Sequence, residues 1–226
     1  MDSSFIQTLL LTGKLAVYST PILLVVSLPV SYWLSYSKFR LKHFVEAIIS
    51  MPMVLPPSVI GYYILVLYSP QNWFGAWLAN TFNARLAFTF EGLLVASVLF
   101  NLPFMIQPLC NGMRALPHCL LEASYTLGKS KITTFFKVLL PNIKPSIITA
   151  VALTFAHTIG EFGIVLMVGG NIPGETRVAS IAIYDEVQAL NFDVANRYAF
   201  ILFSISLVLL TLIYSINKKQ KEWMLK

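Results

Sequence analysis

The feature that most constrains this chain is a series of apolar stretches, each of about the length that crosses a lipid bilayer. A transmembrane helix needs about 20 mostly apolar residues. Five such stretches are present, at residues 9–36, 45–68, 92–110, 147–168 and 198–216. Only 12% of the residues are charged, against about 25% in soluble domains. We therefore expect an all-α membrane protein, built as one domain over residues 1–226 with five transmembrane helices.

The basic residues alternate between the two sides of these expected spans. Twelve of the 16 lysines and arginines follow the first span, surround residues 111–144 or end the chain: Lys38, Arg40, Lys42, Arg114, Lys129, Lys131, Lys137, Lys144, Lys218, Lys219, Lys221 and Lys226. Lys14, Arg85, Arg177 and Arg197 fall on the other side. Cytoplasmic loops are enriched in Lys and Arg, so we expect residues 111–144 and the C-terminus in the cytoplasm and the N-terminus outside. The same distribution explains the net charge of +6 without nucleic acid.

The second span carries three prolines within six residues, at Pro52, Pro56 and Pro57. Membrane helices tolerate proline where neighbouring groups satisfy the freed backbone. We expect the helix to bend or break near its cytoplasmic third. Two interpretations stay open: a packing kink, or a hinge or unwound segment of a transport pathway. In the second case Pro56, Pro57 and Ser58 are candidate pathway residues.

Residues 178–190, between the fourth and fifth spans, are too few and too acidic to cross a bilayer alone. The sequence IAIYDEVQAL within them predicts a short amphipathic helix. This segment could re-enter the membrane without crossing it.

Glu161 lies inside the fourth span, in the sequence HTIGEFG. A carboxylate in a membrane span is energetically costly and marks a functional site by default. His157 lies one turn earlier on the same helical face, so the two side chains could pair. With Phe162 and Gly163, Glu161 is a candidate gate or pathway residue, and a structural hydrogen bond is the alternative. A metal ion would need further ligands, and we expect none.

The most polar and basic stretch is 122–141, EASYTLGKSKITTFFKVLLP. A helix beginning near Leu120 would place Leu120, Ala123 and Leu127 on one face. Gly128 suits the left-handed position that ends a helix, and a second short helix would follow. We expect Pro141 to limit that second helix.

Two interpretations of this stretch are open. One is an ordinary amphipathic loop between two membrane helices. The other is a cytoplasmic helix-turn-helix in which the small residues Ala123, Ser124 and Gly128 let a partner protein approach the backbone closely.

The spacing in this stretch resembles the EAA loop of ABC-importer permeases, which reads Glu-Ala-Ala, three residues, Gly, nine residues, an aliphatic, one residue, Leu-Pro. The matching residues are Glu122, Ala123, Gly128, Val138, Leu140 and Pro141. Ser124 stands where the pattern has Ala, and Val138 where Ile is usual. The resemblance implies that the loop, about residues 111–144, couples the chain to a separate ATPase through Leu120, Glu122, Ala123, Ser124, Leu127, Gly128, Leu140 and Pro141.

Two further stretches, MPMVLPPSVIGYYIL and GEFG with NIPGETR, resemble molybdate importer permeases. The resemblance runs from about residue 39 to the last span, and the short chain also fits that family. Sulfate permeases share the EFG-like stretch but usually run longer and lack the NIPGETR form.

This resemblance implies the type I ABC-importer permease fold, a second copy of the chain and an external binding protein. It also implies cytoplasmic ATPase subunits that hold ATP and Mg, and a place in the lipid of a bacterial or archaeal plasma membrane. Sulfate or tungstate import stays an alternative, as does a channel or scaffold subunit working without ATP.

The chain shows no motif for catalysis or for cofactor binding. It lacks a Gly-rich phosphate loop with Lys and Ser or Thr, so ATP is not expected to bind this chain itself. It also lacks a Ser-His-Asp arrangement and a G-x-S-x-G elbow. We therefore expect a transport subunit without catalytic residues rather than an enzyme.

Overall fold

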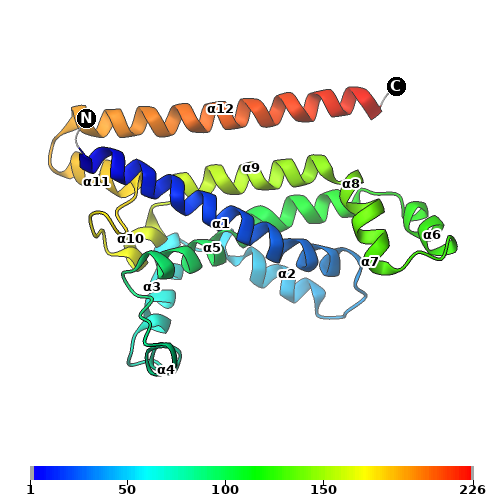
Figure 1. Ribbon diagram of the computed structural model, residues 1–226, viewed down its shortest axis with the longest axis horizontal. Coiled ribbons are helices and arrows are strands. Elements are labelled where there is room, and N and C mark those ends of the chain that lie inside the picture. Colours follow the sequence, from blue (N-terminus) through cyan, green and yellow to red (C-terminus); the bar gives the residue numbers. More distant parts are fainter. Residues whose placement is uncertain (1–2, 225–226) are drawn as a thin grey trace.

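The computed structural model describes the backbone of residues 3–224 and the side chains of residues 3–215. Within these residues all regular secondary structure is helical, and the long helices run side by side along the longest axis (Figure 1). Three helices are long and apolar enough to cross a membrane: α1 (Ser3–Tyr36), α5 (Phe90–Arg114) and α12 (Phe192–Met224). If each of two bent helix pairs, Lys42–Met53 with Pro57–Tyr68 and Lys131–Asn142 with Lys144–Gly160, is counted as one span, the number is five, as predicted.

The first bent pair is the proline-rich second span. It consists of α2 (Lys42–Ser50), the short turn η1 (Met51–Met53) and α3 (Pro57–Tyr68), and its two halves meet at 105°. Pro56 is extended, at φ −54° and ψ 133°, because a residue before proline avoids the helical region. Pro57 takes the first turn of α3, where a missing N–H costs nothing. The predicted break is confirmed.

The fourth span is also broken, so the prediction of one continuous helix over residues 147–168 is wrong. α9 (Lys144–Gly160) ends before Glu161, which is extended at φ −67° and ψ 128°, and α10 (Gly163–Gly169) begins two residues later. Glycine disfavours a helix by about 1 kcal/mol relative to alanine, and one glycine stands on each side of the break. The hydroxyl of Ser180 donates to the Glu161 carbonyl at 2.5 Å, which satisfies backbone at the break.

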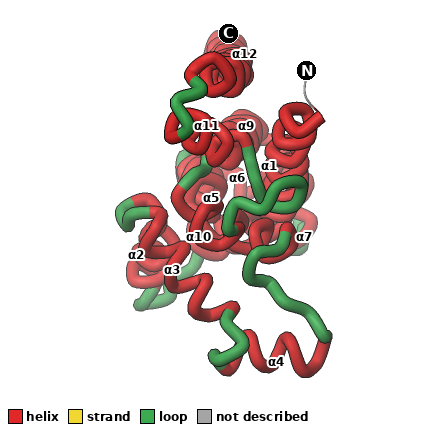
Figure 2. Tube along the Cα trace, turned by 90° about the vertical axis from the view of Figure 1, so that its left-hand side faces the viewer, coloured by secondary structure: helices red, strands yellow, loops and turns green. Residues whose placement is uncertain are grey.

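The central helix of the bundle is α5, which packs against α1, α9, α10 and α3 (Figure 2). Two apolar clusters follow each other along it. The outer cluster contains Leu93, Ala96 and Phe100 of α5 with residues of α1, α3 and α10. The inner cluster contains Met105, Leu109 and Met113 with residues of α1 and α9. α12 lies at the edge of the bundle, where it packs mainly on α11 and α9 and where its Tyr198 ring lies 4.3 Å from the Phe5 ring of α1, centroid to centroid.

One face of α1 is lined by small hydroxyl side chains, all buried: Thr8, Thr12, Ser19, Thr20, Ser27 and Ser31. Small residues let membrane helices approach each other closely. The phenol of Tyr36 donates to the Met113 carbonyl at 2.9 Å, which joins α1 to the inner end of α5. The N–H of Ala179 donates to Thr12 Oγ1 at 2.8 Å, which holds the start of α11 (Ala179–Gln188) on α1. The helix predicted within residues 178–190 is confirmed, and its re-entry stays a prediction.

The bundle has two different ends. The N-terminus and α11 lie at one end, and α4 (Trp73–Phe82) projects below the bundle in Figure 1. α6 (His118–Thr126), α7 (Lys131–Thr134) and the end of α12 lie at the other end. The basic residues that follow α1 and those around α6 therefore share one end, as the charge pattern predicts. The side chains of Lys218, Lys219, Lys221 and Lys226 lie outside the described residues.

The close approach of α1 to its neighbours can be tested at Ser27, which is fully buried and whose hydroxyl has no hydrogen-bond partner. Ser27→Leu should destabilise the fold by about 1–3 kcal/mol, because extra carbons must be forced into a packed interface. Ser27→Ala should leave stability unchanged or higher, because it removes an unsatisfied polar group. The measurement is the thermal unfolding midpoint of the purified protein in detergent, and equal midpoints for the two variants would contradict this packing.

Candidate functional site

The first candidate site is the end of α6, where the chain turns toward α7. Gly128 has φ +70°, and its N–H donates to the Tyr125 carbonyl at 2.9 Å. The N–H of Lys129 donates to the Ser124 carbonyl at 3.1 Å. These two bonds are the pair of a Schellman motif, in which a left-handed residue ends the helix. The predicted role of Gly128 in ending the helix is confirmed.

The two faces of α6 differ in exposure. Glu122, Ala123 and Leu127 are exposed, with 75% of the Leu127 side chain accessible, and Leu120 is half-buried. Ser124 is only 5% exposed, and its hydroxyl lies 2.8 Å from that of Thr134 in α7. The expectation that Ser124 belongs to the exposed small-residue surface is wrong, because it lies about a third of a turn from Ala123 and faces α7. Its place in the structure is the joint between the two short helices.

The second helix of this loop does not stop before Pro141. α7 continues through the π-helical turn η2 (Phe135–Leu139) into α8 (Leu140–Asn142), and a bend of 74° then leads into α9. A π turn inserts one extra residue into a helix, which accommodates the missing N–H of Pro141. Phe135 and Leu140 pack against the inner cluster on α5. The loop is therefore attached to the bundle core.

The two broken spans contact each other at their breaks. A Cβ added to Gly163, at the start of α10, would lie 2.8 Å from the Cβ of Pro57, at the start of α3. One turn further, a Cβ on Gly61 would lie 2.8 Å from the Cβ of Met167. The sequence indicated these two segments separately, and the structure places them side by side. Pro56, Pro57 and Ser58 are exposed, and Phe162 and Gly163 are half-buried.

Glu161 lies at this contact in a buried polar network between α5 and the end of α9. Its Oε2 accepts hydrogen bonds from Ser97 Oγ at 2.8 Å and Asn101 Nδ2 at 3.1 Å. The Oδ1 of Asn101 accepts from His157 Nδ1 at 2.8 Å. His157 and Glu161 are thus joined through Asn101 and do not pair directly, because α9 ends before Glu161 and the spacing of a continuous helix is lost. Oε1 of Glu161 is buried and has no hydrogen-bond partner.

The loop that carries the NIPGETR sequence is held by its own polar contacts. The Arg177 guanidinium lies 3.2 Å from a carboxylate oxygen of Asp185 and 3.6 Å from one of Glu186, both on α11. The hydroxyl of Thr176 donates to the Gly169 carbonyl at 2.5 Å. This loop therefore fastens the end of α10 to α11.

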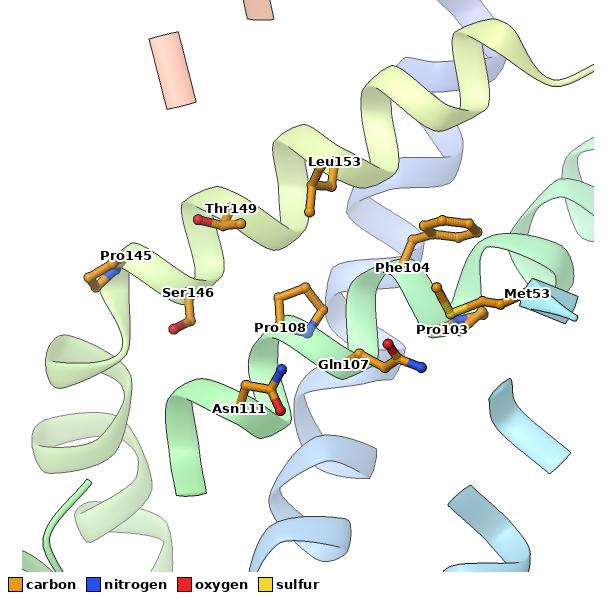
Figure 3. Close-up of a pocket in the computed structure, with 10 residues that line it drawn as sticks. All are labelled: Met53, Pro103, Phe104, Gln107, Pro108, Asn111, Pro145, Ser146, Thr149 and Leu153. Atoms are coloured by element: carbon orange, nitrogen blue, oxygen red, sulfur yellow. The ribbon is translucent and has the colours of Figure 1, made fainter. Parts of the chain in front are cut away.

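The structure also shows a cavity of about 520 Å³ between α5 and α9, which the sequence analysis did not identify (Figure 3). Its described lining has no charged side chain and consists of Met53, Pro103, Phe104, Gln107, Pro108, Asn111, Pro145, Ser146, Thr149 and Leu153. Asn111, Ser146 and Thr149 lie toward one end and Phe104, Pro103 and Met53 toward the other, with Gln107 between them beside Pro103 (Figure 3). The signal in the sequence was two amide side chains one helical turn apart, Gln107 at the end of the span predicted at residues 92–110 and Asn111 directly after it.

Comparison with known proteins gives the family. The profile described as "Binding-protein-dependent transport system inner membrane component" matches residues 5–220. The molybdenum transport system permease protein ModB of Azotobacter vinelandii is 43% identical over 205 residues, covering 91% of each chain. The sulfate transport system permease protein CysT of Escherichia coli K12 is 31% identical over 199 residues, covering 88% of this chain and 70% of CysT.

Solved structures give the fold. An inward-facing structure of the MetNI methionine ABC transporter matches with a TM-score of 0.74 at 18% identity, over 97% of this chain and 99% of that one. A bacterial ABC transporter involved in the import of alginate matches with a TM-score of 0.78 at 16% identity, over 97% of this chain and 80% of that one. The predicted fold of an ABC-importer permease is confirmed.

The buried network can be tested at Glu161. Glu161→Ala leaves the Ser97 hydroxyl without its acceptor and removes one of the acceptors of Asn101 Nδ2, and an unsatisfied buried donor costs about 1–3 kcal/mol. Glu161→Gln keeps a carbonyl oxygen for both donors, so its loss of stability should be smaller. Thermal unfolding in detergent measures the difference. If the alanine variant unfolds no earlier than the glutamine variant, the network does not stabilise the break.

Proposed function

Because the chain belongs to the family of binding-protein-dependent transport system inner membrane components, we propose that it imports molybdate as the permease subunit of an ABC transporter. The observation that carries the choice of molybdate is the higher identity to a molybdenum permease than to sulfate permeases. The chain itself is a transport subunit and not an enzyme, and a partner ATPase hydrolyses the ATP. Tungstate and sulfate are the alternative substrates.

The exposed face of α6 is the docking surface for a cytoplasmic ATPase that holds ATP and Mg. Leu120, Glu122, Ala123 and Leu127 give this face a mixed apolar and acidic character, and Gly128 adds no side chain beside it. This assignment puts α6 and the C-terminus in the cytoplasm of a bacterial or archaeal cell and the N-terminus outside. An external binding protein then delivers the oxyanion at the end that holds α11.

Motion of α6 reaches the membrane helices through two contacts. The first is the hydrogen bond between Ser124 and Thr134, which ties α6 to α7. The second is the packing of Phe135 and Leu140 on the inner cluster of α5 and α9. When ATP closes the ATPase dimer, α6 moves with it, and α5 and α9 are moved in turn.

The breaks in the second and fourth spans are the places where the bundle bends. Transporters commonly build their pathway from such discontinuous helices. Pro56, Pro57 and Ser58 on one side, with Glu161, Phe162 and Gly163 on the other, form the gate. A second copy of the chain completes the pathway, since two-fold symmetry is the commonest way to close an oligomer. The two copies rock between inward-facing and outward-facing states.

The substrate is tested by uptake into vesicles that contain the permease, its ATPase and its binding protein. We expect ATP-dependent uptake of labelled molybdate, inhibited by unlabelled molybdate more strongly than by equal concentrations of sulfate. Equal or stronger competition by sulfate or tungstate would transfer the assignment to that ion. Uptake that continues without ATP would instead support a channel.

Coupling is tested at Gly128. Gly128→Val should abolish co-purification with the ATPase, because a left-handed conformation costs an ordinary residue about 1–2 kcal/mol and a β-branched one more. Gly128→Asn should retain part of the association, because asparagine adopts this conformation more readily.

The matched control for this experiment is Gly13→Val, at a glycine in α1 whose added Cβ would meet no atom within 4 Å. This variant should assemble normally. Normal assembly of Gly128→Val as well would argue against docking through the end of α6.

A further inference from the structure

The cavity between α5 and α9 presents neutral hydrogen-bonding groups from two helices. Gln107 and Asn111 are one turn apart on α5, and Ser146 and Thr149 are one turn apart on α9, so each pair shares a helical face. All four line the same cavity (Figure 3). An amide nitrogen carries two N–H donors and a hydroxyl carries one. Among the described residues, Gln107 Nε2 donates a hydrogen bond to Ser50 Oγ at 3.2 Å, and the side chains of Asn111 and Ser146 donate none. Donors therefore remain at this end of the cavity.

The charges around this end favour an anion over a cation. No acidic side chain lines the cavity among the described residues. The nearest acid across the adjoining cavity is Glu46, which is ion-paired with Arg114, one turn beyond Asn111. Lys144 is exposed directly before the lining residue Pro145. The charged side chains near this end are thus one mutually neutralising pair and one lysine, and the lining itself is uncharged.

The opposite end of the cavity is lined by apolar side chains. Phe104 lies there, and its ring stacks on His157 with centroids 3.8 Å apart. His157 is hydrogen-bonded to Asn101, which also binds Glu161. An apolar wall supported by this network would stop a hydrated ion, so an ion in the cavity stays at the end near Asn111 and Ser146.

From this geometry we infer that the cavity is a binding station for the transported tetrahedral oxyanion, held by the neutral donors of Asn111 and Ser146 at its polar end and of Gln107 at its middle. The inference rests on the proposed function. A volume of about 520 Å³ corresponds to on the order of 15 waters at ~30 Å³ each, so the ion keeps much of its hydration shell. Binding by few neutral donors is weak, and a pathway requires binding that is weak enough for the ion to leave.

The test is an added negative charge at the station. Asn111→Asp changes the side chain little in size but places a carboxylate beside the dianion, so molybdate uptake at low concentration should fall by about tenfold or more. Gln107→Glu should reduce uptake in the same direction. Asn80→Asp makes the same substitution at an exposed residue of α4, outside both the cavity lining and residues 111–144, and its uptake should stay within about twofold of the unmodified protein.

Co-purification with the ATPase and basal ATP hydrolysis show whether each variant is assembled. If assembled Asn111→Asp and Gln107→Glu both import molybdate as well as Asn80→Asp does, the station is refuted while the proposed function stands. If only one of these two variants assembles with the ATPase, molybdate uptake by that variant decides whether the station exists. If the unmodified complex imports no oxyanion at all, the proposed function fails first, and that result is separate from any effect of the variants.

Discussion

The requirement that every backbone polar group inside a bilayer be satisfied by the protein governs the rest of this structure. Two of its spans are broken, and a broken helix releases N–H and carbonyl groups that lipid cannot bind. The breaks are permitted because they lie against each other and against neighbouring helices. Pro57 contacts Gly163 closely, and Ser180 donates to the carbonyl of Glu161. The two breaks are therefore packed against each other, and a change of backbone conformation at one break must alter the packing at the other.

The buried polar network has a defined place between two apolar clusters. Along α5 the outer cluster ends at Phe100, Asn101 follows, and the inner cluster begins at Met105. A partly satisfied polar group in such a position is expensive, and the free Oε1 of Glu161 is one. This arrangement is typical of a place where stability is given up for function. It also lies beside the apolar end of the cavity, since Phe104 stacks on His157.

The loop at residues 111–144 is packed onto the helical bundle. α6 leaves one face open to a partner and uses the other, through Ser124, to hold α7. α7 and α8 in turn are fixed to the core by Phe135 and Leu140. Packed side chains transmit a displacement because a close-packed interior has little room to deform. Under the docking proposed for α6, a displacement of α6 would pass through these contacts to α5 and α9.

The sequence by itself determined the class of protein, the number of spans, the break at Pro56 and the turn at Gly128. Each of these follows from local chemistry: apolar length, the restricted backbone of proline, and the freedom of glycine at positive φ. Only the tertiary structure decided that the fourth span breaks at Glu161, that Asn101 stands between His157 and Glu161, and that Ser124 faces inward. It also decided that amide side chains of α5 share a cavity with hydroxyls of α9. These features depend on which helices contact each other and at what position along their lengths. The periodicity of a single segment determines neither the partner helix nor the position.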